Sequence, residues 1–133
     1  NDSLKNFIYK SILYMTKLLF HILNLIFVIF YLYPGSIVGF IIYDDFKKQP
    51  QITPDFIVSS NHIYAFGILS LFGFVTYIKS HKNFIIYYFF LISIIFELLH
   101  LIIPNRSFQF SDLFGNIFGV LFSLLLISIW KKK

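Results

Sequence analysis

Five polar side chains stand where two long apolar runs meet in the second half of the chain. They are Glu97, His100, Arg106, Asp112 and Asn116. Ionisable groups are costly inside a bilayer, so those found there are functional or are paired with one another. Arginine binds phosphate and carboxylate through charge-assisted hydrogen bonds, and the other residues could orient such a ligand. This segment is therefore the first candidate for a functional site.

The spacing of these residues predicts that they converge. Glu97 and His100 are three residues apart on one predicted helix. Asp112 and Asn116 are four apart on the next, so each pair shares a helix face. His62 opens an earlier apolar stretch and is expected at a similar depth, with the arginine in the connecting turn above.

Such a cluster allows several kinds of chemistry. His62, Glu97 and His100 could bind a divalent metal, but a dedicated site needs three or four ligands. His62 and His100 could instead be the axial ligands of a haem. Glu97 and His100 could serve as acid and base in a hydrolase, but the chain has no G-x-S-x-G nucleophile motif. We therefore expect no cofactor and no enzyme, with haem or a divalent metal at His62 and His100 as the alternative.

Each residue also has a structural interpretation. Asp112 is suited to the start of a helix, where an acidic side chain caps the chain and favours the helix dipole. Arg106 could pair with Asp112 or Glu97 and so lock the connection between the two helices. Asn116 could be an interhelical hydrogen-bond donor, which is common in membrane bundles.

Other motifs point to packing. Gly115 and Gly119 form a small-xxx-small pair, which predicts a close helix–helix contact. His21 and Asn24 share a face of the first predicted helix but lie near its other end, away from the cluster. We expect His21 to pack or to reach the membrane surface, and His81 to be an ordinary turn residue.

Composition shows what must position these residues. Of the 133 residues, 58% are hydrophobic and only 13% are charged, and a soluble domain would have about twice that charged fraction. The chain is therefore expected to be one integral membrane domain over residues 1–133. The absence of cysteine excludes disulfides and thiolate metal sites. The net charge of +5 is divided between the two ends of the predicted helices, so nucleic-acid binding is not expected.

The expected fold is an all-α membrane four-helix bundle, because four apolar stretches are long enough to cross a bilayer. They lie near 13–33, 61–78, 84–103 and 112–130. The stretch near 61–78 is the weakest, since serine, threonine and glycine dilute it. Residues 34–60 form a long connection, in which the apolar part from Gly35 to Tyr43 could lie in the interface or dip back into the protein.

Basic residues predict the orientation. One side has Lys5, Lys10, Lys17, Lys79, Lys82 and Lys131 to Lys133. The other has Lys47, Lys48 and Arg106. By the positive-inside rule, both termini and the 79–83 turn are expected to be cytoplasmic, and the long 34–60 loop and the 104–111 turn external.

The stretch from Glu97 to Gly119 follows the pattern E-x-x-[polar]…P-x-R-x-F…S-D-x-x-x-N-x-x-G and resembles the VanZ-like family of small bacterial membrane proteins. The segment that starts at His62 is similar to the family's H-F-x-x-Y-x-x-L. Where the family usually has glutamine, this chain has His100, and the family's Asp-Lys pair is replaced by Val58 and Ser59. A site that depends on that pair would be altered here.

The resemblance covers roughly residues 18–130. It implies a multi-pass protein of the bacterial inner membrane with four or more helices, and an association with low-level resistance to glycopeptides such as teicoplanin. It implies no catalytic mechanism.

Two functions remain open at this stage. In the first, the external polar cluster binds an anionic lipid or cell-envelope group. Its residues are His62, Glu97, His100, Arg106, Asp112 and Asn116. In the second, the protein is an accessory or structural subunit of a larger membrane complex, and the cluster joins the helices. The expected partners are membrane lipids in the first case and other membrane-protein subunits in the second. The ligand, the oligomeric state and the role of the 34–60 loop stay open.

Overall fold

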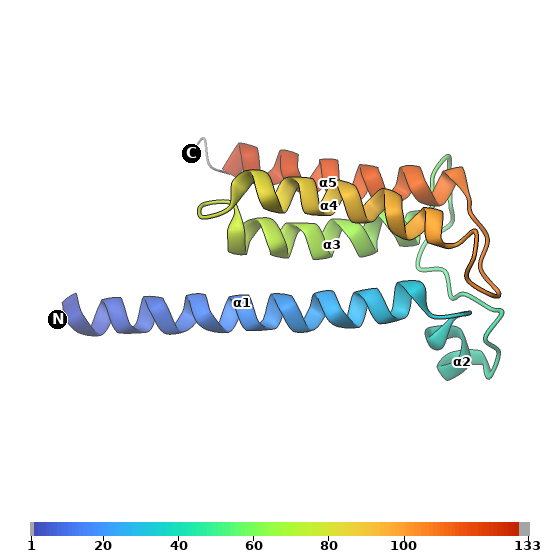
Figure 1. The fold of residues 1–133 in the computed structure, drawn as a ribbon, viewed down its shortest axis with the longest axis horizontal. Coiled ribbons are helices and arrows are strands. Elements are labelled where there is room, and N and C mark those ends of the chain that lie inside the picture. The colour runs from blue at the N-terminus through green and yellow to red at the C-terminus, as the bar shows by residue number, and fades with distance from the viewer. Residues whose placement is uncertain (1, 131–133) are drawn as a thin grey trace.

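Five helices and no strand make up residues 2–130, the part of the chain that the computed structural model describes (Figure 1). They are α1 (Asp2–Leu32), α2 (Ile37–Tyr43), α3 (Ser60–Tyr77), α4 (Lys82–Leu99) and α5 (Phe110–Trp130). The prediction of an all-α fold is confirmed. The lysines at 131–133, which entered the orientation argument, lie outside the described residues.

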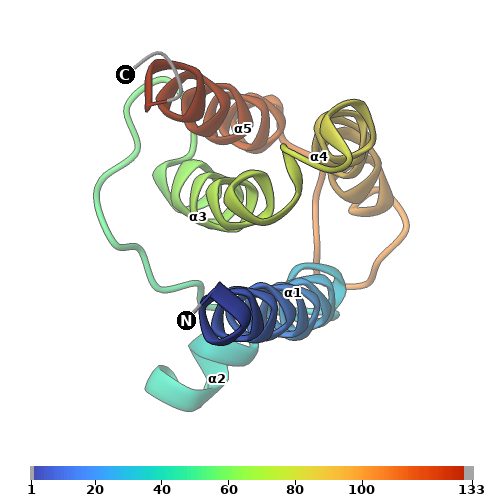
Figure 2. The ribbon, with the colours of Figure 1, turned by 90° about the vertical axis from the view of Figure 1, so that its left-hand side faces the viewer.

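The helices α3, α4 and α5 pack together, and α1 runs along one side of this three-helix unit (Figures 1 and 2). The contact between α3 and α5 is by far the most extensive. α1 touches α3 about as much as α4 does, but of its 31 residues only Phe20 and Tyr31 are buried. All four expected long helices are present. They form a three-helix unit with a loosely attached fourth helix, not an evenly packed bundle.

Three helices, α1, α4 and α5, are long and apolar enough to cross a membrane. The predicted span near 61–78 forms a helix, α3, but α3 does not reach the same mean hydropathy. Its polar side chains, among them Ser60, His62, Ser70 and Thr76, are buried. Because α3 is covered by its neighbours, these groups need not face lipid, and the helix can carry a more polar sequence.

Glycines allow the close contact between α3 and α5. A Cβ atom added at Gly119 would lie 2.6 Å from the Ile63 carbonyl oxygen, and one at Gly115 would lie 2.7 Å from that of Ser59. The Ser123 hydroxyl then donates to the Gly67 carbonyl at 2.6 Å across the same interface. Here the small-xxx-small pair places two helix backbones within reach of each other.

Helix α1 begins well before the predicted start near residue 13. The segment from Asp2 has no proline or glycine to stop a helix, and Asp2 itself suits the positive end of the helix dipole. With 31 residues, α1 is about 46 Å long, which exceeds the ~30 Å apolar thickness of a bilayer. Its first turns run past the end of the three-helix unit (Figure 1).

The chain leaves α1 at Pro34 and Gly35 and turns into the short helix α2. Gly35 has a φ of 112°, which side chains rarely allow, and the Ser36 side chain caps α2 by accepting from the Gly39 amide at 2.9 Å. Phe40 stacks on Phe46 of the following loop, with ring centroids 4.2 Å apart. Helix α2 thus lies beside the end of α1 (Figure 1) and does not dip back between the long helices.

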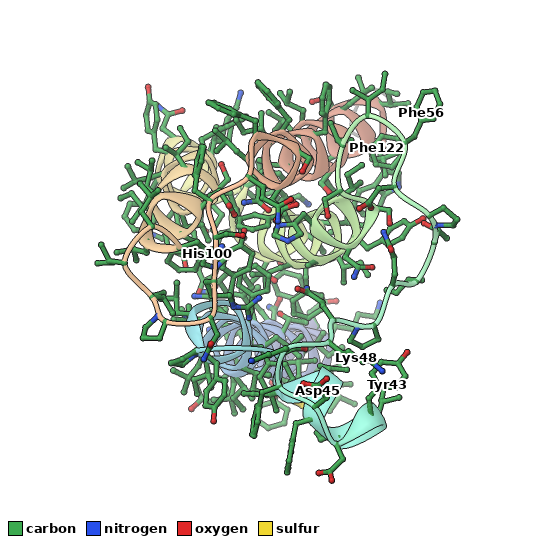
Figure 3. All side chains as sticks on the ribbon, turned by 90° about the vertical axis from the view of Figure 1, so that its right-hand side faces the viewer. Tyr43, Asp45, Lys48, Phe56, His100 and Phe122 are labelled. Carbon is green, nitrogen blue, oxygen red and sulfur yellow. The ribbon has the colours of Figure 1, made fainter. Side chains whose placement is uncertain are left out.

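The rest of the long connection crosses the end of the molecule and is anchored at the start of α3. Asn61 donates to the Pro50 carbonyl at 2.7 Å and accepts from the Ile52 amide at 3.0 Å. Phe56, which is 93% exposed, points away from the helices (Figure 3). Exposed apolar side chains at a helix end suit the boundary between lipid and water.

Candidate functional site

Tyr31 is the centre of a hydrogen-bonded cluster that joins four helices. Its buried hydroxyl donates to Glu97 Oε2 at 2.8 Å and accepts from Asn116 Nδ2 at 2.7 Å. His62 Nδ1 lies 3.0 Å from the same oxygen. These contacts tie α1 to α4, α5 and α3. Compared with the cluster predicted from the sequence, the observed one includes Tyr31 and leaves out Arg106. From here on, the polar cluster means Tyr31, His62, Glu97, His100, Asp112 and Asn116.

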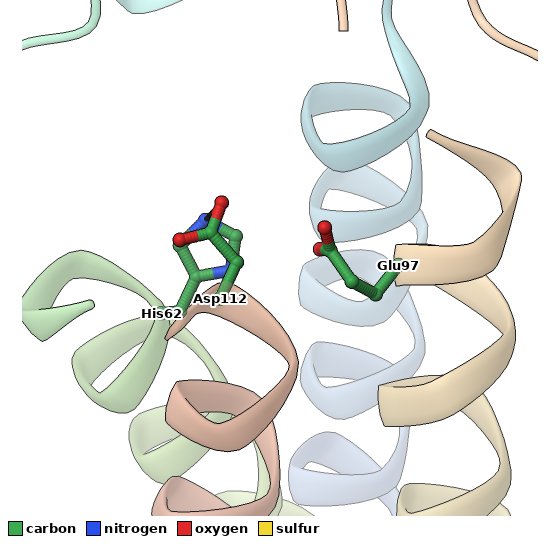
Figure 4. Close-up of side chains that lie close together, drawn as sticks. All are labelled: His62, Glu97 and Asp112. Carbon is green, nitrogen blue, oxygen red and sulfur yellow. Dashed lines mark ion pairs between the residues drawn. The ribbon is translucent and has the colours of Figure 1, made fainter. Parts of the chain in front are cut away.

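The amide of Asn116 determines which nitrogen of His62 carries a proton. Asn116 Nδ2 donates to the Ser93 carbonyl at 3.1 Å, so the amide oxygen faces the imidazole. His62 Nδ1 lies 2.9 Å from that oxygen and therefore donates to it. On the other edge of the ring, Nε2 lies 3.4 Å from Asp112 Oδ2 (Figure 4). The Asp112 carboxyl group therefore faces the ring edge that the amide leaves open.

His100 and Glu97 form a second pair of the same kind. His100 Nε2 lies 3.0 Å from the Tyr31 carbonyl oxygen, so this nitrogen donates. The other nitrogen, Nδ1, faces Glu97 Oε2 at 3.3 Å. Glu97 Oε1 accepts from the Gln109 amide at 3.0 Å. His100 lies between the end of α4 and α1 (Figure 3).

The polar cluster pairs its ionisable groups with one another. It holds two carboxyl groups and two imidazoles, and each carboxyl group faces one imidazole. Within residues 2–130, every buried side-chain nitrogen or oxygen has a hydrogen-bond partner. Glu97 and Asn116 have 0% exposure, so this internal pairing is what makes their burial tolerable.

Arg106 lies beside the polar cluster but does not pair with it. Its Nε donates to the Tyr33 carbonyl at 3.1 Å, and its Nη2 donates to the Phe30 carbonyl at 3.1 Å. It therefore caps the C-terminal end of α1, where the helix dipole favours a cation. The alternative in which Arg106 pairs with Asp112 or Glu97 is not observed. In the described part of the chain, no carboxylate lies within 4.0 Å of this guanidinium.

Burial lowers the pKa of Arg106, but a guanidinium stays protonated at physiological pH. A positive charge therefore remains beside the polar cluster, with no carboxylate of residues 2–130 within 4.0 Å of it.

A cavity of about 610 Å³ lies between α1 and α3 and ends at the polar cluster. Most of its wall is apolar, with side chains such as Leu23, Phe27, Leu69 and Phe72 along the two helices. The polar lining lies at one end and in the loop above it. It consists of Tyr31, Ser36, Gln49, Asn61, His62, His100 and Arg106. The cavity is thus amphipathic, with a cationic head region and an apolar body.

The geometry gives different support to the two cofactor alternatives. Ligand atoms of His62, Glu97 and Asp112 lie within 4.8 Å of one another, and two carboxylates with one imidazole could hold a divalent ion (Figure 4). His100 is not part of that group. Each of these atoms already has a protein partner, so an ion would have to displace existing contacts.

The haem alternative is less well supported. Both nitrogens of His62 and of His100 contact other protein groups, which leaves none for haem iron in this arrangement.

The start of α3 has Val58 and Ser59 where the family pattern has an Asp-Lys pair. Asp55 Oδ1 accepts from the Ser60 amide at 2.7 Å, so this carboxylate caps the first turn of α3 from the preceding loop. The Ser59 amide donates to the Ser111 carbonyl at 3.1 Å and joins α3 to the start of α5. Val58 is partly buried and has no polar side chain to offer. Asp55 therefore supplies a helix cap and is not part of the polar cluster.

Replacing Asp55 with alanine is expected to fray the first turn of α3, with a cost of about 1 kcal/mol for a lost cap. The Ser60 amide holds the pKa of Asp55 below its usual range. The stability that this cap contributes is therefore fully present above the ordinary carboxyl pKa. It is lost as the pH falls through the lower pKa that Asp55 has in the folded state. Hydrogen exchange of the Ser60 amide against pH measures this. Asp55→Asn keeps the acceptor and should remove only the pH dependence; a pH dependence unchanged in Asp55→Asn would contradict the assignment.

Sequence reasoning and structure agree on much of the site. The structure brings together five of the six expected residues and places Arg106 next to them, on other partners. Helix α5 begins at Phe110, so Asp112 lies within its first turn and not at its cap. Tyr31, the centre of the cluster, was not expected. The available signal was a hydroxyl near the end of the first apolar run, at the depth predicted for Glu97.

Comparison with known proteins identifies a family. The VanZ/LLP1 family model matches residues 7–131, which is nearly the whole chain. No curated protein and no solved structure was found to match.

Proposed function

The chain belongs to the VanZ/LLP1 family, and from this premise we propose that it is a membrane protein that binds an amphiphile with an anionic head group in the cavity between α1 and α3. The head group would contact Arg106, and the tail would lie along the apolar wall. A lipid-linked cell-envelope intermediate has this form, and so does a glycopeptide with a lipid tail. Glycopeptide resistance would then follow from the capture of one of these molecules.

The observation that carries the proposal is the position of Arg106. Its guanidinium lines the polar end of the cavity and has no carboxylate within 4.0 Å among the described residues. Two of its donors are held by carbonyls of α1, which fixes the plane of the group. Its Nη1 has only a long contact, 3.4 Å, to the Gln49 side chain. That donor, with its charge, is available to a phosphate or carboxylate.

The surroundings of Arg106 support the same assignment. Glu97 and Asp112 each face an imidazole and not the guanidinium. Asn61 and Gln49 add uncharged hydrogen-bonding groups to the same end of the cavity. Arg106 lines the cavity whereas the two carboxyl groups do not, so an anionic head group is favoured over a cationic one.

The apolar body of the cavity supports an acyl or polyprenyl tail. Only Phe20 and Tyr31 of α1 are buried, so the cavity lies along a seam between a loosely held helix and the three-helix unit. A lipid can enter such a seam from the bilayer without crossing water. By the positive-inside rule the lysines of α1 and of the 79–83 turn would be cytoplasmic, which puts the head-group end on the external side of the cytoplasmic membrane.

The proposal is tested with a polyprenyl phosphate and the polyprenol of the same chain length. We expect the detergent-solubilised wild-type protein to bind the phosphate about tenfold more tightly than the alcohol, as one charge-assisted contact supplies. Arg106→Gln should abolish that preference, and Arg106→Lys should keep part of it. Binding is followed by native mass spectrometry at increasing ligand concentration.

A second variant tests the tail. Ala65 lines the cavity, and phenylalanine at this position would fill part of it. Ala65→Phe should weaken the phosphate and the alcohol equally, whereas Val75→Phe, on an exposed position of the same helix, should weaken neither. Equal affinity of the wild type for phosphate and alcohol would refute the anionic head group. Unchanged binding in Ala65→Phe would refute the cavity as its location.

A further inference from the structure

A second cavity, of about 410 Å³, lies at the opposite end of the molecule between α1, α3 and α4. Its polar lining comes from α1, from the end of α3 and its turn, and from α4. The residues are His21, Asn24, Tyr77, His81 and Tyr88. No acidic side chain lines this cavity. It shares no lining residue with the cavity at the polar cluster, so it is a separate site.

Hydrogen bonds across this cavity hold its walls in place. His21 Nε2 lies 2.7 Å from the Tyr77 hydroxyl, and the Tyr88 hydroxyl donates to Asn24 Oδ1 at 2.8 Å. Each bond joins α1 to a helix of the three-helix unit. Together with the buried Phe20 of α1, they hold α1 against α3 and α4 beside the cavity. Phe84 and Ile85 complete an apolar wall on α4.

The charges around this cavity all have one sign. The Lys17 ammonium lies 5.7 Å from the centre of the Tyr77 ring, and Lys17 precedes His21 by one turn of α1. Lys79 and Lys82 flank His81 in the turn between α3 and α4. The acidic residues of the connection and of the polar cluster belong to the other end of the helices. Asp2 shares α1 with Lys17, but fifteen residues place it about 22 Å away along the axis.

We propose that this second cavity binds the phosphodiester head group of an anionic phospholipid. Lys17 and the 79–82 turn supply the positive charge, and His21, Tyr77 and Tyr88 supply hydrogen-bonding groups. The acyl chains follow the apolar wall of Phe84 and Ile85 into the surrounding lipid. Basic pockets between membrane helices recognise anionic head groups in this way. The site is independent of the proposed function and serves a different leaflet.

The test uses the full chain in mild detergent with phosphatidylglycerol and with phosphatidylcholine of the same acyl chains. Native mass spectrometry measures how much of each lipid the protein retains. We expect a clear preference for phosphatidylglycerol in the wild type, and a loss of about fivefold in its affinity for Lys17→Gln. Lys10→Gln is the matched control. Lys10 lies seven residues earlier on the same face of α1, about 10 Å further from the cavity.

Three results would overturn the proposal. Equal retention of the two lipids would show that the head-group charge is not recognised. An equal loss in Lys10→Gln and Lys17→Gln would show diffuse attraction to the lysines of α1 and no defined site. Loss of phosphatidylglycerol in Arg106→Gln, with no effect of Lys17→Gln, would place the lipid in the first cavity. Arg106→Gln is otherwise expected to leave this lipid in place, which separates the two sites experimentally.

Discussion

Replacing Glu97 with leucine is expected to release α1 from the rest of the molecule. The side chain has 0% exposure and is the acceptor for the Tyr31 hydroxyl and the Gln109 amide. It is also the partner of His100 at 3.3 Å. Leucine would remove the acceptor of the buried Tyr31 hydroxyl and the partner of the buried His100 Nδ1, and it would also release the Gln109 amide, at a cost on the order of 3–5 kcal/mol. Unfolding in mixed micelles, with hydrogen exchange at the Gln109 amide, measures both the global and the local loss.

Ser93→Ala is the matched control for this change. Ser93 is also on α4 and fully buried, but its hydroxyl donates only to the Phe90 carbonyl within its own helix. Its loss should cost much less, because no second helix loses a partner. Glu97→Gln should fall between the two, since an amide keeps one acceptor. Similar stabilities for Glu97→Leu and Ser93→Ala would contradict the role of Glu97 as the link between helices.

Replacing Gly119 with alanine is expected to separate α3 from α5. The added Cβ atom would lie 2.6 Å from the Ile63 carbonyl oxygen and 2.8 Å from the Gly67 amide nitrogen. Both are backbone atoms, so no side chain can turn away, and the helices themselves must move. We expect a loss of about 2–3 kcal/mol from such overpacking, together with loss of the Ser123 hydrogen bond to Gly67. The unfolding midpoint in mixed micelles measures the loss.

Gly67→Ala provides the comparison across the same interface. Its added Cβ atom would meet its nearest neighbour, the Gly119 carbonyl oxygen, at 3.7 Å, which is an ordinary contact. Helix propensity favours alanine over glycine, so this variant should be neutral or slightly stabilising. If Gly119→Ala were as stable as Gly67→Ala, the close approach of the two backbones would be refuted.

The long helices could be predicted from the sequence because a bilayer imposes length and hydropathy on each span. α4 and α5 lie close to their predicted ranges for that reason. The start of α1 could not be found in this way, since its first turns extend past the apolar thickness and carry lysines that a span would avoid. The buried position of α3 was also hard to predict. Its serines and threonine lower its hydropathy, so the stretch resembles a weak membrane span, although neighbouring helices bury these hydroxyls.

Most of the site could be predicted because polar side chains in apolar runs are rare and must meet one another. Helical spacing alone placed Glu97, His100, Asp112 and Asn116 at one level. Tyr31 could not be singled out, because tyrosine is also common at membrane boundaries, where its hydroxyl needs no protein partner. The partners of Arg106 could not be predicted either. They are backbone carbonyls at the C-terminal end of α1. Every helix ends in such unpaired carbonyls whatever its sequence, so no residue type indicates which of them the arginine will bind.

The sparse packing of α1 bears on how the chain is assembled during synthesis. A helix that is apolar on nearly every side is stable in lipid alone, so α1 can enter the bilayer before its neighbours exist. Among the described helices, α5 follows the others in the chain and brings Asn116 and Asp112. Until it docks, His62 lacks two of its three side-chain partners, and the Tyr31 hydroxyl lacks one of its three, in an apolar medium. The docking of α5 thus completes the polar cluster, and a nascent chain held before that step is the form most exposed to misassembly.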